Sequence, residues 1–249
     1  MRSRQDPYIR TGAGLLLAGG LLLPVGYLVL HSAPYGALGM SLIILGAICL
    51  ALARARPPIP PEFGRILLET GLENTGALVE ELGLRSRAVY LPSSLTAGPP
   101  QALIPLHSNG TMPNIAHALP KRLVARYGPG AEDLGLLVTT PGSRALAALP
   151  YPPGASPQEA EAALSAILVG MADLATGVRV SQSGPTVNVT VFGTHLSYAH
   201  GHAWLHQCLG SPIASIVATV MAEAMGSPLA VEAEEVKGSR HTITLAMVK

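Results

Sequence analysis

Two long hydrophobic runs, almost free of polar side chains, dominate the first 56 residues. They cover residues 11–30 and 35–53, and residues 31–34 form a short break between them. No lysine, arginine, aspartate or glutamate occurs between Arg10 and Arg54. Each run has about 19–20 residues, the length that an α-helix needs to cross the ~30 Å hydrocarbon core of a bilayer. The pattern therefore predicts a transmembrane helical hairpin.

After the hairpin, the pattern changes to a short proline-rich segment and then to amphipathic segments. Residues 57–61 contain four prolines, a composition that favours an extended and stiff spacer. We therefore divide the chain into a hairpin at 1–56, a linker at 57–61 and a soluble domain at 62–249. This last part is long enough to bury a hydrophobic core of its own.

A helical pattern followed by two alternating patterns occurs twice in the second half of the chain. Pro157 and Pro212 each follow a serine that can cap a helix, and Gly177 and Gly226 end the two helical patterns. We interpret residues 62–106, which begin with a helical pattern, as a degenerate third copy. One antiparallel sheet with helices packed on one face accommodates such α-β-β units, so we predict an α+β fold. The expected strands are 88–91, 102–106, 134–140, 178–181, 187–191, 229–234 and 241–247.

Charge is distributed unevenly along the chain and predicts an orientation. Residues 1–56 carry a net charge of +4, whereas residues 57–249 carry −3. Arginines flank both outer ends of the hairpin and none lies in its turn, so the positive-inside rule places both termini and the soluble domain in the cytoplasm. A cleaved signal peptide is the alternative for the first run, but the second run argues against it. The acidic soluble part excludes nucleic acid as an expected partner.

Small residues in the hairpin predict how its helices pack. Gly14 with Ala18, and Ala37 with Ser41, form small-xxx-small pairs that let helix backbones approach closely. These pairs fit packing of one span on the other, and a homo-oligomer through the membrane is an alternative that they do not require. The only ionisable side chain between the two spans is His31. We therefore expect the hairpin to be an anchor and not a transport path.

The densest group of chemically versatile side chains lies at residues 195–208, with four of the eight histidines and the only tryptophan. Imidazole ligates zinc, iron and copper, and His202 and His206 would share a helix face. The spacing matches no specific zinc motif, so we assign no metal or cofactor. The open alternatives are a metal or haem site at His200, His202 and His206, a small-molecule pocket, and a structural role. The candidate ligand-binding residues are His195, His200, His202, Trp204 and His206.

The usual catalytic templates do not occur in this sequence. A nucleophile elbow, a P-loop and a dinucleotide-binding glycine motif are all absent. Glu232 and Glu234 follow the alternating pattern of residues 229–234, so we expect both carboxylates on the solvated face of a strand.

The order of elements after Cys208 resembles a known family. An amphipathic helix is followed by Gly226, a strand that contains Glu232-Ala233-Glu234-Glu235, a turn with Gly238, and a closing strand. This order is similar to the C-terminal part of the 4-vinyl-reductase-type ligand-binding domain. The family carries cysteines near the strand turn, and this chain has none there. The resemblance therefore implies small-molecule sensing or a scaffold role, and no cysteine-based metal site.

Together these patterns indicate a binding protein held at the membrane. We expect a membrane-anchored cytoplasmic domain that binds a small molecule or acts as a regulatory scaffold, with no evident catalysis. A second hypothesis is a membrane-anchored metal- or haem-dependent enzyme that uses residues 195–208. A third is a structural module that forms homo-oligomers through its sheet edge or its spans.

Overall fold

The computed structural model describes residues 7–29, 32–55, 61–107, 113, 115, 117–194 and 203–248. The chain forms two compact units, Met1–Glu69 and Thr70–Lys249. The predicted linker at 57–61 lies outside the described residues except for Pro61, which begins a helix. Each unit is described by itself.

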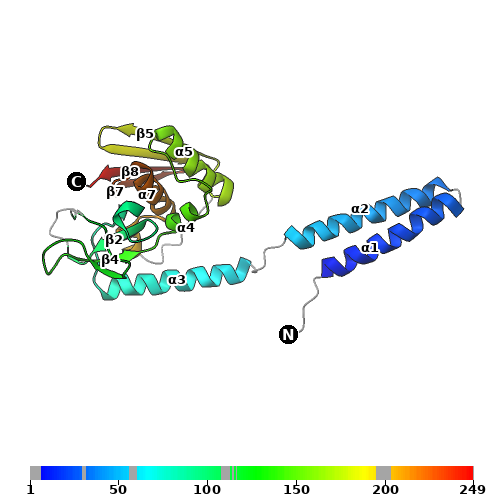
Figure 1. The fold of residues 1–249 in the computed structure, drawn as a ribbon, viewed down its shortest axis with the longest axis horizontal. Helices are drawn as coiled ribbons and strands as arrows, with labels where there is room; N and C mark the ends of the chain where they lie inside the picture. Colours follow the sequence, from blue (N-terminus) through cyan, green and yellow to red (C-terminus); the bar gives the residue numbers. More distant parts are fainter. Residues whose placement is uncertain are drawn as a thin grey trace. The chain divides into compact units, whose positions relative to one another are not determined.

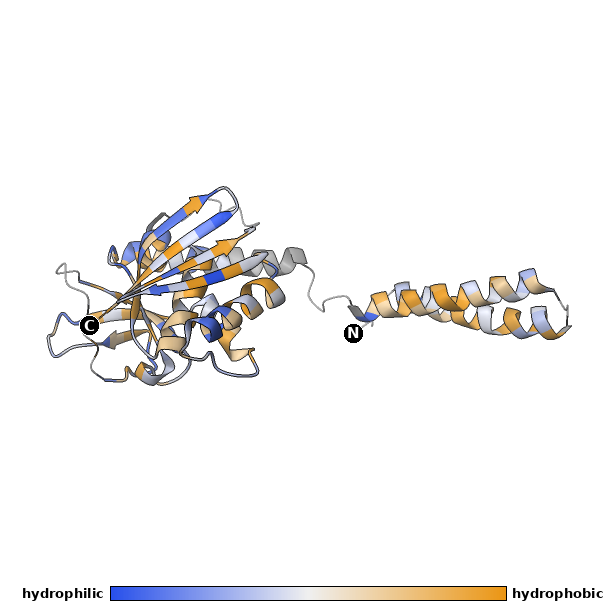
Figure 2. Cartoon of the chain, turned by 90° about the horizontal axis from the view of Figure 1, so that it is seen from above, coloured by the Kyte–Doolittle hydropathy of each residue, from blue (hydrophilic) through white to orange (hydrophobic). Residues whose placement is uncertain are grey.

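The first unit contains two antiparallel apolar helices (Figure 1), and its last residues form the start of helix α3 (Pro61–Glu81). Helix α1 (Pro7–Pro24) continues into the π-helical turn Val25–Val29, and helix α2 covers Ala33–Ala55. Hydrophobic residues are spread along the length of both helices (Figure 2), as expected for surfaces that face lipid. The candidate membrane spans within them are Tyr8–Leu28, with 21 residues, and Ala33–Arg54, with 22 residues. The predicted pair of apolar helices is therefore confirmed.

Glycines one heptad apart bring these two helices together. Gly12 and Gly19 on α1 are buried, as are Gly26 in the π-helical turn that follows it and Gly39 and Gly46 on α2. A Cβ atom on Gly19 would lie 2.7 Å from the carbonyl oxygen of Gly39. The prediction that Gly14, Ala18, Ala37 and Ser41 pack one span on the other is wrong, because all four lie on exposed positions. Both patterns are small-residue patterns, and a sequence does not distinguish which one faces the partner helix.

The second unit is built on one eight-stranded antiparallel sheet, with the strand order β3-β4-β2-β1-β7-β8-β6-β5. Helix α3 (Pro61–Glu81) precedes the first strand. Two α-β-β units follow as predicted, one of α5 (Pro157–Ser165), β5 and β6, and one of α7 (Pro212–Met225), β7 and β8. The strands are β1 (Val89–Leu91), β2 (Gln101–Pro105), β3 (Val124–Arg126), β4 (Leu134–Val138), β5 (Gly177–Ser183), β6 (Thr186–Phe192), β7 (Leu229–Lys237) and β8 (Arg240–Met247).

The helices pack on one face of this sheet, which confirms the predicted α+β architecture. Helix α7 (Pro212–Met225) lies at the centre of the main core, and side chains from α3, from α5 (Pro157–Ser165) and from α6 (Ala203–Leu209) join it there. Trp204–Met225 is hydrophobic enough to resemble a membrane span, but 72% of its apolar 18-residue window is buried. It is therefore a core segment. Loop residues Ile115 and Leu119 cover part of the opposite face.

Three local features differ from the sequence prediction. Helix α5 passes into a π-helical segment that ends at Met171, so Gly177 does not end the helix but begins β5. The short strand β3 and helix α4 (Pro141–Ala147) were not predicted. Both are too short for their hydrophobic period to stand out from the surrounding loop residues.

Candidate functional site

A gap in the sheet ladder between β1 and β7 creates a cleft in the second unit. Strand β7 has nine residues, but it pairs with β1 only at Leu229 and Ala230. Beyond this point the chain before β1 leaves the ladder, because the N–H of Ala88 donates to the carbonyl oxygen of Cys208 in α6 at 2.8 Å. The C-terminal end of α6 therefore lies where a longer β1 would continue.

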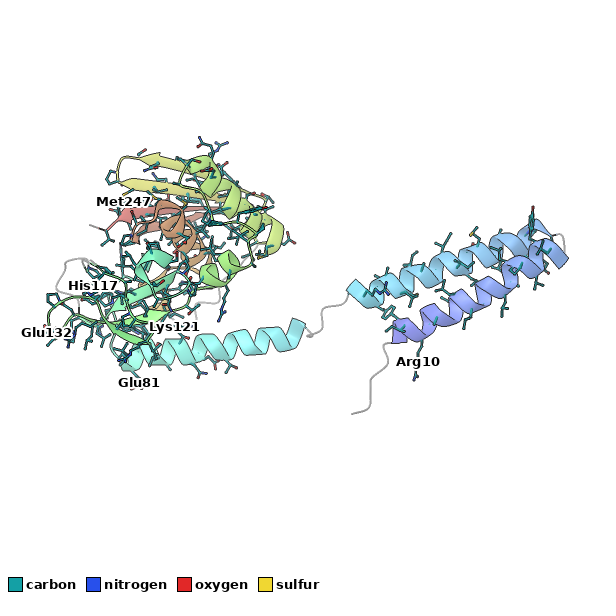
Figure 3. All side chains as sticks on the ribbon, in the orientation of Figure 1. Arg10, Glu81, His117, Lys121, Glu132 and Met247 are labelled. Carbon is teal, nitrogen blue, oxygen red and sulfur yellow. The ribbon has the colours of Figure 1, made fainter. Side chains whose placement is uncertain are left out.

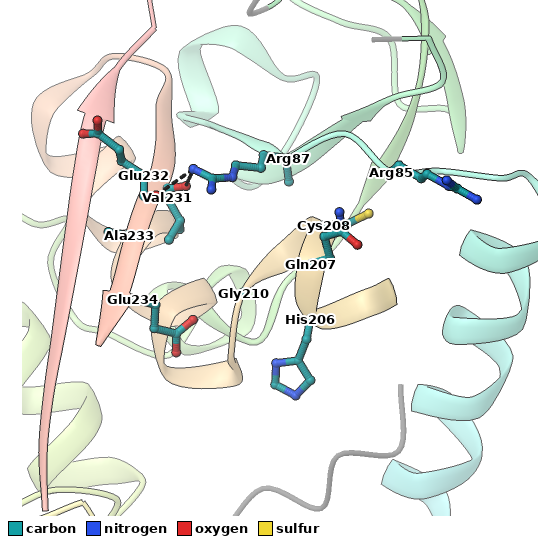
Figure 4. A pocket seen from close by; sticks show the side chains of 11 residues that line it. Arg85, Arg87, His206, Gln207, Cys208, Gly210, Val231, Glu232, Ala233 and Glu234 are labelled. Atoms are coloured by element: carbon teal, nitrogen blue, oxygen red, sulfur yellow. Dashed lines mark hydrogen bonds between the residues drawn. The ribbon is translucent and has the colours of Figure 1, made fainter. Parts of the chain in front are cut away.

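The cleft between α6 and β7 has a volume of 330 Å³. Figure 4 shows its lining from three segments: the chain before β1, the end of α6 and the first half of β7. Arg87 crosses the gap and donates from Nη1 to the carbonyl oxygen of Glu232 at 2.6 Å and, more weakly, to that of Val231 at 3.4 Å. A guanidinium thus replaces strand β1 as the partner of these carbonyls. The remaining lining residues are Arg85, Ala88, His206, Gln207, Cys208, Gly210, Ala233 and Glu234.

A β-bulge in β7 changes which side chains face the cleft. The pairing with β8 shifts between Val231 and Ala233, so Glu232 is an extra residue in the strand. Glu234 consequently pairs with Ile243, a core residue, and its side chain lies on the helix-covered face. The expectation that Glu234 lies on the solvated face is therefore wrong. The extra residue reverses the alternation on which that expectation rested.

Glu234 is fixed by groups from two elements. Its Oε1 lies 2.6 Å from Nε2 of His241 in β8, and its Oε2 accepts the N–H of Ser211 at 3.0 Å. Ser211 is also the N-cap of α7, where its hydroxyl accepts the N–H of Ala214. The side chain of His241 is 1% exposed and that of Glu234 is 22% exposed. Counted with its backbone, Glu234 is an exposed residue of the strand. This carboxylate is therefore held rigidly at the cleft wall.

Two of the titratable groups that line the cleft, Glu234 and Cys208, have pKa values shifted in opposite directions. Burial acts to raise the pKa of Glu234, but hydrogen bonds from His241 and from the hydroxyl and N–H of Ser211 lower it by more, so that the pKa lies below its ordinary value. Burial raises the pKa of the Cys208 thiol to about 11, and its Sγ lies 3.5 Å from the carbonyl oxygen of Leu84. The cleft therefore presents a carboxylate and a protonated thiol at neutral pH.

The structure locates part of the predicted histidine cluster at this cleft. His206 lines it, and Trp204 lies next to it, where its ring is 4.6 Å from the guanidinium carbon of Arg85. Trp204 and Arg85 also line a second cavity of 180 Å³ that reaches the end of α3. The other predicted residues, His195, His200 and His202, lie outside the described residues.

Metal ligation has no site in the described part of the chain. No three side chains of histidine, cysteine, aspartate or glutamate come together there in a way that could hold a metal ion. Because His200 and His202 lie outside this part, the predicted metal set with His206 stays a prediction.

Sequence reasoning missed the arginines and Glu234 as parts of the site. Arg85 and Arg87 stand in a short polar segment before a strand, where charged residues are common and carry no motif. Gly210 has a φ of +69° between two helices, and a Cβ atom there would lie 3.3 Å from Oε2 of Glu234. The one local sequence signal for this part of the site was the dipeptide Gly210-Ser211 before Pro212. It marks a helix start next to the histidine-rich segment 195–208.

Outside this chain's own family, the comparisons give no further relative. No curated protein and no solved structure matches the chain. One family model matches residues 1–247, which include both the apolar hairpin and the sheet domain. The chain therefore belongs to the family described as Domain of unknown function (DUF7982).

Proposed function

We propose that this protein is a membrane-anchored cytoplasmic binding domain whose α6–β7 cleft receives a small polar ligand with an acidic group. The anchor is the hairpin of α1 and α2, whose arginines lie at its open end: Arg54 is in the last turn of α2, and Arg10 lies near the start of α1 (Figure 3). The positive-inside rule favours the cytoplasm for this end and hence for the domain that follows.

The observation that carries the proposal is the convergence of charged groups in a cleft that interrupts the sheet. Its volume of 330 Å³ falls at the lower end of ligand pockets, which measure about 300–1,000 Å³. A guanidinium has five N–H donors, and the two carbonyl oxygens use only those on Nη1 of Arg87. The other donors of this side chain suit a carboxylate or phosphate, which arginine recognises through paired hydrogen bonds.

Binding fits the cleft better than catalysis does. A cysteine nucleophile acts as a thiolate, and the raised pKa of Cys208 keeps the only cleft thiol protonated. The Glu234 carboxylate is already bonded to His241 and Ser211, which suits a fixed wall of charge more than a proton carrier. A regulatory or scaffold role at the membrane follows from a binding site of this kind.

A thermal-shift experiment tests the proposal with the full-length protein in detergent micelles. Trp204 is the only tryptophan and lies in the sheet domain, so its fluorescence reports unfolding of that domain. A panel of small mono- and dicarboxylates and inorganic phosphate should include a compound that raises the melting temperature. At a concentration of 100 times its Kd, the stabilisation is about 2.7 kcal/mol. Arg87→Gln should abolish the shift.

The matched control is Arg126→Gln, which changes an exposed arginine on the edge strand β3. This variant should keep the full shift. The proposal is contradicted if no compound of the panel stabilises the wild-type protein. It is also contradicted if a compound stabilises wild type and Arg87→Gln equally.

A further inference from the structure

Among the residues that the structure describes, strand β7 has an open edge in the middle of the sheet order. It pairs with β8 along its length from Leu229 to Lys237, whereas β1 covers only its first two residues. From the bulge to Lys237, no described residue forms a ladder with the other edge of β7. Residues 232–237 are all exposed. Such an edge offers a row of backbone donors and acceptors.

The hairpin register shows which backbone groups face outward. The loop between β7 and β8 has two residues, Gly238 and Ser239, so Lys237 and Arg240 form its closing hydrogen-bonded pair. Hydrogen-bonded and non-bonded pairs alternate along an antiparallel ladder. Glu234 and Val236 therefore direct their N–H and C=O groups away from β8 and toward the open edge.

Arg87 marks one end of this edge. Its Nη1 donates to the carbonyl oxygen of Glu232 at 2.6 Å, at the point where β1 and β7 separate. Along the strand from there, the charged residues are the glutamates Glu232, Glu234 and Glu235 and, at the end of the strand, Lys237, which forms an ion pair with Glu235. The edge therefore has a positive end inside the cleft and a negative flank beside it.

We propose that this open edge binds an extended peptide as an added antiparallel strand, with its C-terminal carboxylate at Arg87 and basic residues beside the glutamates of β7. The peptide would pair with the outward groups of Glu234 and Val236. Strand addition and capture of a terminal carboxylate are both established modes of peptide recognition. This inference rests on the proposed function, because it uses the same cleft.

The shape of the site favours a chain over a compact molecule. The cleft lining ends at Glu234, but the open edge continues to Lys237 in solvent. A compact acid would fill the cleft and leave Val236 unused, although this apolar side chain is 59% exposed. A strand rises by about 3.3 Å per residue, so a peptide reaches both the arginine and the outer edge.

Fluorescence anisotropy with the full-length protein in detergent micelles tests the inference. The probe is a fluorescein-labelled hexapeptide of alternating lysine and valine with a free carboxyl end, compared with the same peptide as its amide. The free acid should bind at least tenfold more tightly than the amide. A peptide with N-methyl groups on alternate residues, which removes half of its donors, should lose at least tenfold in affinity.

Matched variants of one residue test the strand edge. Val236→Pro removes an N–H that points away from β8, and proline is tolerated where a strand's N–H is not part of a ladder. This variant should bind the peptide at least tenfold more weakly, whereas Val236→Thr, which keeps the N–H, should bind it normally. Equal binding of acid and amide, of methylated and unmethylated peptide, or of the two variants would overturn the inference. If small acids still bind in an Arg87-dependent way, the proposed function survives that result.

Discussion

Thr140 and Thr219 share a hydrogen bond of 2.7 Å between their Oγ1 atoms, buried where α4 meets α7. Thr140 is the N-cap of α4, and its hydroxyl also accepts the N–H of Ser143. Thr219 in turn donates to the carbonyl oxygen of Ser215 at 2.7 Å. A small hydroxyl network therefore connects the start of one helix to the middle of the central one.

Removal of the Thr219 hydroxyl should weaken this contact measurably. Thr219→Val keeps the shape of the side chain but leaves Thr140 without a partner on α7, which costs about 1–2 kcal/mol. For a domain of this size the melting temperature should fall by about 2–8 °C. The measurement is thermal unfolding of the full-length protein, followed through Trp204 fluorescence. Thr242→Val, on the face of β8 opposite the helices, is the control and should change little.

The Glu234 contact should make stability depend on pH in the acid range. Because the pKa of Glu234 is lowered by folding, its contribution is fully present above the ordinary value of 4.5 and is lost as the pH falls through the folded value. Glu234→Gln should therefore be about 1–2 kcal/mol less stable than wild type at pH 7. The difference should shrink as the pH falls below 4.5. Melting curves over the pH range give both quantities.

A neighbouring carboxylate provides the control for this experiment. Glu235 has a 60% exposed side chain and an ion pair of 2.7 Å with the exposed Lys237. Exposed pairs of this kind contribute at most about 1 kcal/mol, so Glu235→Gln should be close to wild type at every pH. A stability difference for Glu234→Gln that stays constant from pH 3 to pH 7 would contradict the assignment.

The fold could be predicted largely because its elements are long and periodic. The two apolar runs and the repeated α-β-β units have hydrophobic patterns that extend over enough residues to identify them. Single residues at special positions escaped prediction. The bulge at Glu232 inserts one residue and reverses the side-chain alternation after it, and no feature of the local sequence announces this.

The candidate site could be predicted only in part, for a related reason. The histidine-rich segment indicated a region, and His206 lies in the cleft. Arg87 and Glu234 are 147 positions apart in the sequence and meet only because β1 and β7 are neighbours in the sheet. Strand order of this kind depends on tertiary packing, which a single sequence does not reveal.

The orientation of the anchor should follow the arginines around it. We expect green fluorescent protein fused after Lys249 to fluoresce in a bacterial host, and alkaline phosphatase at the same position to be inactive. Arg54→Ala and Arg56→Ala together, with two arginines inserted in the 31–34 turn, should reverse or mix these signals. Active phosphatase on the unchanged chain would place the sheet domain outside and contradict the cytoplasmic assignment.

Close packing of the hairpin should depend on which of two adjacent glycines is changed. A Cβ atom on Gly19 would meet the carbonyl oxygen of Gly39 at 2.7 Å and the backbone N of Ile43 at 2.9 Å, so Gly19→Ala must push the helices apart. A Cβ atom on Gly20 meets nothing within 4 Å, so Gly20→Ala changes helix propensity to the same degree without a clash.

Spin labels at Leu17 and Ile44, both on exposed positions, can report the separation of the two helices in lipid nanodiscs. Electron paramagnetic resonance should show a longer or broader distance for Gly19→Ala and the wild-type distance for Gly20→Ala. Identical distances for both variants would contradict the close contact between Gly19 and Gly39.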